Sequence, residues 1–92
     1  MKIAGTERNI AVLERFCFAL NIKISAVWDK EQRISEAGKV VTIYEAAMKS
    51  ANSKTDIELD PDSVSFIKQW LSRSFIMLRN DDKNLLNALT NE

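Results

Sequence analysis

The stretch that decides the fold class is residues 60–79, DPDSVSFIKQWLSRSFIMLR. Asp60 is a typical helix N-cap, and Pro61 suits the first helical position because its missing N–H would have no helical acceptor there. Asp62 then places negative charge near the positive end of the helix dipole. Apolar side chains recur every three or four residues through the rest of the run, which predicts a helix over 61–79.

This predicted helix carries more apolar surface than one core-facing side requires. A narrow arc must face the core and consists of Val64, Ile67, Leu71, Phe75 and Leu78. Beside it lies a second ridge, made of Phe66, Trp70 and Met77, with Arg73 at its margin. Large aromatic side chains anchor protein interfaces because they bury much area and freeze few rotamers. We predict that this ridge binds a partner or a second copy; the alternative is that a small domain uses these aromatics in its own core.

Two further helices are predicted upstream. The first begins after Gly5 with Thr6 as its cap and ends at Asn21, and its core face consists of Ile10, Leu13, Phe16, Cys17 and Leu20. The second covers 34–51, where an apolar stripe widened by Val40 and Ala47 is made of Ile34, Ala37, Val41, Tyr44, Met48 and Ala51. Between them, 22–28 is assigned to helix, although its weak alternation also fits a strand.

The chain is therefore expected to be a single all-α domain over 1–92, a small bundle of three main helices plus a short C-terminal helix. Asn80 or Asp81 is the expected cap of that last helix, whose Leu85, Leu86 and Leu89 return to the core. Two glycines and one proline are too few for a many-stranded sheet. The alternative is an α+β fold with a small sheet from 22–28, 39–44 and 56–59.

The composition argues against most catalytic and metal chemistry. The chain has no histidine, which removes the imidazole base of most hydrolases and the common metal ligand. Its single cysteine, Cys17, stands between two phenylalanines and is expected to be a buried thiol without a disulfide. We expect no enzyme activity, no cofactor and no metal.

The charge balance lowers the expectation of nucleic-acid binding, because 13 basic residues are matched by 13 acidic ones and neither half is a basic arm. A helix-turn-helix over 13–32 is nevertheless an alternative, with Asn21 in the turn and with Lys23, Ser25 and Lys30 reaching DNA. Against it, Ile24 and Trp28 would fill positions that are normally polar, and acidic residues follow at once.

Carboxylates alternate along an acidic strip made of Asp56, Glu58, Asp60 and Asp62. A calcium loop is excluded, because Pro61 and Ile67 stand where such a loop needs glycine and the closing glutamate. We interpret the strip as an extended connector that packs Ile57 and Leu59 inward. The alternatives are a docking strip for a basic partner or an edge strand.

No window of the sequence approaches the ~18 apolar residues of a membrane helix, and the chain starts without a leader pattern, so we expect a cytoplasmic protein without a membrane partner. The functional expectation is a non-catalytic regulator, inhibitor or adaptor that acts by protein–protein interaction as a homo-oligomer, in the manner of many phage accessory proteins. The first alternative is a DNA-binding transcriptional regulator. The second is a protein that binds a small anionic ligand through lysines and arginines.

Overall fold

A computed structural model describes residues 1–26, 29–72 and 79–90 of the chain. In these residues the protein has four helices, α1 (Glu7–Ile24), α2 (Lys30–Ser53), α3 (Pro61–Leu71) and α4 (Asn80–Thr90). Two very short strands, β1 (Lys2–Ile3) and β2 (Ile57–Glu58), complete the described structure. The prediction of a mostly helical small bundle is confirmed.

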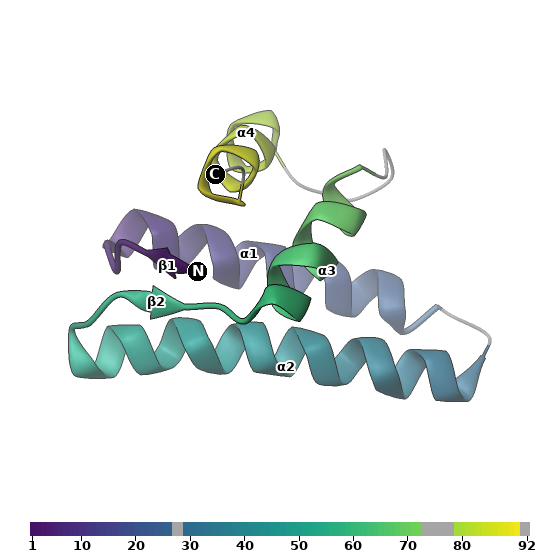
Figure 1. Cartoon of the computed structure of the whole chain (residues 1–92). Coiled ribbons are helices and arrows are strands. Elements are labelled where there is room, and N and C mark those ends of the chain that lie inside the picture. Colours follow the sequence, from purple (N-terminus) through teal and green to yellow (C-terminus); the bar gives the residue numbers. More distant parts are fainter. Residues whose placement is uncertain (27–28, 73–78, 91–92) are drawn as a thin grey trace.

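Helices α1 and α2 run antiparallel along each other and form the long base of the molecule (Figure 1). The Thr6 side chain accepts a hydrogen bond from the Asn9 amide at 3.1 Å, which confirms the predicted start of α1. The predicted end at Asn21 is wrong, because α1 continues to Ile24, whose side chain is buried. Helix α2 is capped by Asp29 and ends at Lys54, whose φ of 54° is left-handed.

The two strands join the start of the chain to the connector between α2 and α3. They pair antiparallel, with Lys2 opposite Glu58 and Ile3 opposite Ile57. The pairing extends by one residue, since the Met1 amino group donates to the Leu59 carbonyl at 2.8 Å and the Leu59 amide donates back at 2.9 Å. The edge strand envisaged for the acidic connector is therefore already paired within this chain.

The alternative sheet prediction is wrong for two of its three segments. Residues 22–24 lie in α1, 25–26 form a turn and 27–28 lie outside the described part, so the helix assigned to 22–28 is confirmed only over 22–24. Residues 39–44 lie in α2, because the buried side chains of Val40, Ile43 and Ala47 follow a helical and not an alternating period. Only 56–59 contains a strand, and its partner is a two-residue segment at the start of the chain.

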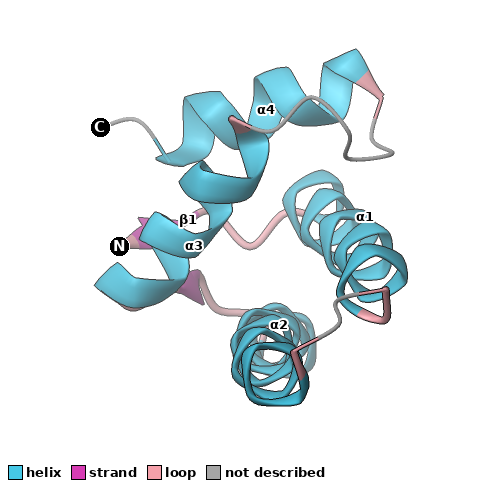
Figure 2. Ribbon diagram, turned by 90° about the vertical axis from the view of Figure 1, so that its right-hand side faces the viewer, coloured by secondary structure: helices cyan, strands magenta, loops and turns pink. Residues whose placement is uncertain are grey.

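Helix α3 begins as predicted, with the Asp60 side chain accepting a hydrogen bond from the Ser63 amide at 2.7 Å. It ends at Leu71 and not at residue 79; residues 73–78 lie outside the described part. Helix α4 starts at Asn80, so the prediction of Asn80 or Asp81 as its cap is wrong; the Lys83 amide donates to the Arg79 carbonyl at 3.0 Å. The helix buries Leu86 and half-buries Leu85 and Leu89, as expected for a terminal helix that returns to the core. Figure 2 shows α3 and α4 on the same side of the α1–α2 pair.

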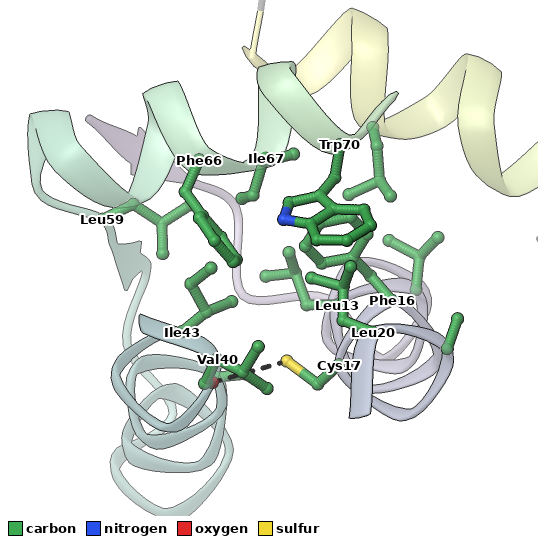
Figure 3. Close-up of a cluster of buried hydrophobic side chains, with 14 of the residues drawn as sticks. Leu13, Phe16, Cys17, Leu20, Val40, Ile43, Leu59, Phe66, Ile67 and Trp70 are labelled. Atoms are coloured by element: carbon green, nitrogen blue, oxygen red, sulfur yellow. Dashed lines mark hydrogen bonds between the residues drawn. The ribbon is translucent and has the colours of Figure 1, made fainter. Parts of the chain in front are cut away.

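The core lies between α3 and the α1–α2 pair. Figure 3 shows Phe66 pointing toward Ile43 and Leu59, while Trp70 lies over Leu13 and Leu20. The largest fully buried apolar side chains come from five different elements or connectors, and they are Val12, Leu13, Phe16, Leu20, Ile43, Ile57, Ile67 and Leu86. Among the residues that the structure describes, the core therefore lies on the inner side of the α1–α2 pair.

Candidate interaction surface

The ridge predicted as an interface lies in the core where the structure describes it. Phe66 and Trp70 are each 3% exposed, and their rings meet edge to face with centroids 6.3 Å apart. Phe66 and Trp70 therefore follow the alternative, in which a small domain uses these aromatics in its own core, and neither is exposed to a partner. In so small a chain α3 needs both of its apolar rows to close the core, and Lys39 covers the Phe66 ring, with its Nζ 5.6 Å from the centroid. Arg73 and Met77 lie outside the described residues.

The exposed apolar surface lies instead on α1 and α2. Five large apolar side chains of the described residues face solvent, and we call them the outer face: Phe18 (65% exposed), Ile22 (62%), Ile34 (62%), Val41 (52%) and Tyr44 (41%). A groove of about 220 Å³ runs between the two helices at this face and is lined by Cys17, Phe18, Asn21, Val40, Val41 and Tyr44. Helices α3 and α4 lie on the other side of the pair (Figure 2).

The outer face exists because α2 carries two apolar rows and only one of them is used by the core. Val40, Ile43 and Ala47 are buried. The apolar stripe predicted on this helix forms the other row, and its members Ile34 and Val41 are exposed. Periodicity predicts the helix correctly but does not tell which row another helix covers. On α1 a signal was present but not used: Phe18 and Ile22 are four residues apart and lie off the predicted core face.

The floor of the groove holds the single thiol. Cys17 is 3% exposed, and its Sγ lies 3.7 Å from the Val40 carbonyl oxygen on α2, a contact drawn in Figure 3. Burial raises the pKa of Cys17 to about 12, with a further contribution from the Glu14 carboxylate. The expectation of a buried thiol is confirmed, and the thiolate needed for nucleophilic attack is disfavoured.

The residues proposed for DNA reading do not lie on a helix-turn-helix. Asn21, the expected turn, is inside α1, and the helices that follow each other are an antiparallel pair. Ser25 ends α1, where its hydroxyl donates to the Ile22 carbonyl at 2.8 Å, and Lys30 is the first residue of α2. Lys23 lies half-buried in the last turn of α1. The predicted motif is therefore absent from the described part of 13–32.

All four carboxylates of the acidic strip are exposed, and Ile57 and Leu59 are buried, as the connector interpretation expects. Part of the strip has a structural role. Glu58 lies 3.7 Å from the Lys2 ammonium, and the Ser63 amide that Asp60 caps lowers the pKa of Asp60. Asp56 and Asp62 have no such role in the described hydrogen bonds and ion pairs.

Beside the strip lies a wide groove of about 750 Å³ between α2 and the strands. It is lined by Lys2, Thr42, Glu45, Ala46, Lys49, Ser50, Thr55, Asp56 and Glu58. Its carboxylates and ammonium groups are mixed, which does not favour an anionic ligand. Within 1–26, 29–72 and 79–90, no three histidine, cysteine or acidic side chains are placed to hold a metal ion.

Comparisons with known proteins do not indicate which of these surfaces is functional. No protein-family model matches the chain, no curated protein is detectably similar in sequence, and no solved structure matches its fold. Among the helices of the described residues, none is long and apolar enough to span a bilayer. Within residues 1–26, 29–72 and 79–90, no packing contact explains why the outer face is apolar.

Proposed function

We propose that this protein is a non-catalytic regulator or adaptor that acts by binding a protein through its outer face. The observation that carries the proposal is that five large apolar side chains of α1 and α2 are exposed and that three of them, Phe18, Val41 and Tyr44, line one groove between these helices. Single exposed apolar residues are ordinary, but a contiguous apolar surface on a small domain is typical of an interaction site.

The composition of the outer face supports a protein as the ligand. Phe18 and Tyr44 are aromatic residues of the kind enriched in interfaces, and the groove between them can receive a side chain of the bound surface. Charged residues stand at the margin of the face and not within it; Lys30 and Glu45 lie on α2 close to the exposed apolar row. An apolar centre with a charged rim is the usual anatomy of a protein interface.

The proposal is tested by affinity capture in nuclease-treated lysate from source cells that also express an untagged copy of the chain. The tagged variant Phe18→Ser/Val41→Ser removes two apolar side chains from the face. The tagged control Gln69→Ser/Asn87→Ser changes two exposed positions on α3 and α4. Mass spectrometry then quantifies the untagged copy and every other captured protein separately.

We expect the face variant to lose its bound protein by at least about tenfold, because two interface side chains each contribute about 1–2 kcal/mol. The control should bind as the wild type does, and both variants should keep the wild-type circular dichroism. Equal capture by the face variant, the control and the wild type would overturn the proposal.

A further inference from the structure

Resting on the proposed function, we infer that the protein bound at the outer face is a second copy of this chain. The two copies pair antiparallel about a two-fold axis that crosses α2 between residues 37 and 38. The α1–α2 pair of one copy then packs face to face against the α1–α2 pair of the other, so that the interface consists of four helices in two layers. Four features of α1 and α2 support this arrangement.

The spacing of α2 residues is symmetric about that axis. Lys30, Ile34, Val41 and Glu45 lie at matching steps on either side of Ala37 and Gly38. At 100° per residue, all six fall within an arc of about 100°. In an antiparallel pair crossing at 37–38, Lys30 lies opposite Glu45 of the second copy, and Ile34 lies opposite its Val41.

The two ends of this row carry opposite charges, and the charged side chains are exposed and could form ion pairs with a second copy. Lys30 and Glu45 are both exposed, and neither takes part in an ion pair or side-chain hydrogen bond with another described residue. The two-fold axis places Lys30 of each copy opposite Glu45 of the other copy, which gives one such pair at each end of the contact. The row is therefore complementary to itself in the antiparallel orientation, whereas a parallel pair would place like charges together.

Helix α1 has the same centre of symmetry. The contact between the Cys17 Sγ and the Val40 carbonyl sets the register of the antiparallel helices, so residue 20 of α1 stands at the level of residue 37 of α2. Phe18 and Ile22, the exposed apolar residues of α1, are symmetric about residue 20. One axis therefore places Phe18 opposite Ile22 of the second copy while it pairs Ile34 with Val41.

The Gly38 carbonyl accepts a hydrogen bond from the Thr42 hydroxyl at 3.0 Å, but no described contact within the chain depends on the missing side chain of Gly38. A Cβ atom added there would have no neighbour within 4 Å, so no intramolecular contact requires glycine. Glycine inside a helix is nevertheless less favourable than alanine by about 1 kcal/mol. At the crossing point, a residue without a side chain lets the two α2 backbones approach closely.

Sedimentation equilibrium of the purified full chain tests the arrangement through a charge-reversal cycle. We expect the wild type to be a dimer, and Lys30→Glu and Glu45→Lys each to raise the dimer dissociation constant about tenfold, because each places like charges together at both ends. The double variant Lys30→Glu/Glu45→Lys inverts both pairs and should return to within about threefold of the wild type. Lys68→Glu on α3 is the control and should leave the constant unchanged. Gly38→Leu should stay folded and dissociate to the monomer.

A wild type that stays monomeric at millimolar concentration would overturn the inference, and so would a double variant that remains as weak as the single ones. These failures differ from failure of the proposed function. If the chain is a monomer but Phe18→Ser/Val41→Ser still loses another captured protein, the outer face binds a different partner. If that variant loses nothing, the outer face has no binding role.

Discussion

At the scale of single residues, Gly5 shows how closely the segment between β1 and α1 passes the end of α2. The Ser50 hydroxyl donates to the Thr55 carbonyl, and both oxygen atoms lie close to the position that a Cβ atom at Gly5 would take. A methyl group at Gly5 would overlap both of them. The absence of a side chain is therefore a packing requirement at this position, which is not so at Gly38.

We predict that Gly5→Ala lowers the free energy of unfolding by about 1–3 kcal/mol, because the Thr55 backbone must move away from the new methyl group. Gly38→Ala is the matched control. Measured well below the dissociation constant of the proposed dimer, it should raise the free energy of unfolding by up to about 1 kcal/mol. Urea unfolding followed by circular dichroism measures both. A Gly5→Ala protein as stable as the wild type would contradict the described packing.

Individual residues were predictable from sequence where their role is local. Thr6 and Asp60 were predicted correctly as helix caps, because capping depends only on the side chain and on an amide three residues later in the chain. The structure shows both hydrogen bonds, from the Asn9 amide to Thr6 and from the Ser63 amide to Asp60. The interface role was expected of Phe66, which is buried, whereas no role was predicted for Phe18, which is exposed. Which apolar row faces the core depends on the elements packed against it, and one helix does not contain that information.

At the scale of elements, one ion pair joins α4 to α1. The Arg15 guanidinium donates two hydrogen bonds to the Asp82 carboxylate, from Nε at 2.9 Å and from Nη2 at 2.8 Å. The Asp82 side chain is 9% exposed and that of Arg15 is 50% exposed. These hydrogen bonds lower the pKa of Asp82, with further help from the charges of Arg15 and Arg79, and they raise the pKa of Arg15. The bidentate pair fixes α4 against α1.

We predict that Asp82→Asn lowers the free energy of unfolding at pH 7 by about 1–2 kcal/mol, a value reduced for the solvent around Arg15. Because the folded-state pKa of Asp82 lies below its unfolded value of about 3.9, the stabilisation is complete above about pH 5. It is lost as the pH falls through the folded-state value. Urea unfolding between pH 3 and 7 tests this.

Asp81→Asn is the control for that measurement, since Asp81 is exposed in the same first turn of α4 and makes no such pair. It removes the same charge from the helix start without touching Arg15. If Asp81→Asn and Asp82→Asn destabilised the protein equally at every pH, the ion pair would have no specific role.

The helices themselves were largely predictable, and their ends less so. The start of α3 was found from Asp60 and Pro61, but α1 passes through Asn21 because the apolar period continues to Ile24. The strand β1 was missed because Lys2–Ile3 is too short to show an alternating pattern. Its pairing with β2, about 55 residues later in the chain, depends on the tertiary fold and leaves no local sequence pattern. The same holds for the Arg15–Asp82 pair.

At the scale of the whole molecule, the apolar pattern of the sequence and the packing of the helices explain different parts of the structure. The apolar pattern predicts a helical bundle, and the positions of α3 and α4 determine which side of the α1–α2 pair they cover (Figure 2). The side left open is apolar and carries a self-complementary row on α2. In this account the folded single copy is one half of the functional unit.

The measurement that tests this claim most directly is disulfide trapping with Ile34→Cys/Val41→Cys. The two positions are about 10 Å apart along α2, which is too far for a bond within one chain. In the antiparallel dimer, residue 34 of each copy faces residue 41 of the other. The native Cys17 does not interfere, because it is buried and its pKa is raised to about 12.

After mild oxidation, non-reducing electrophoresis should show the double variant as a covalent dimer that dithiothreitol reverses. Ile34→Cys alone and Val41→Cys alone should remain monomeric, because each lacks its facing thiol. A double variant that stays monomeric, or single variants that cross-link equally well, would contradict the antiparallel pairing of the outer faces.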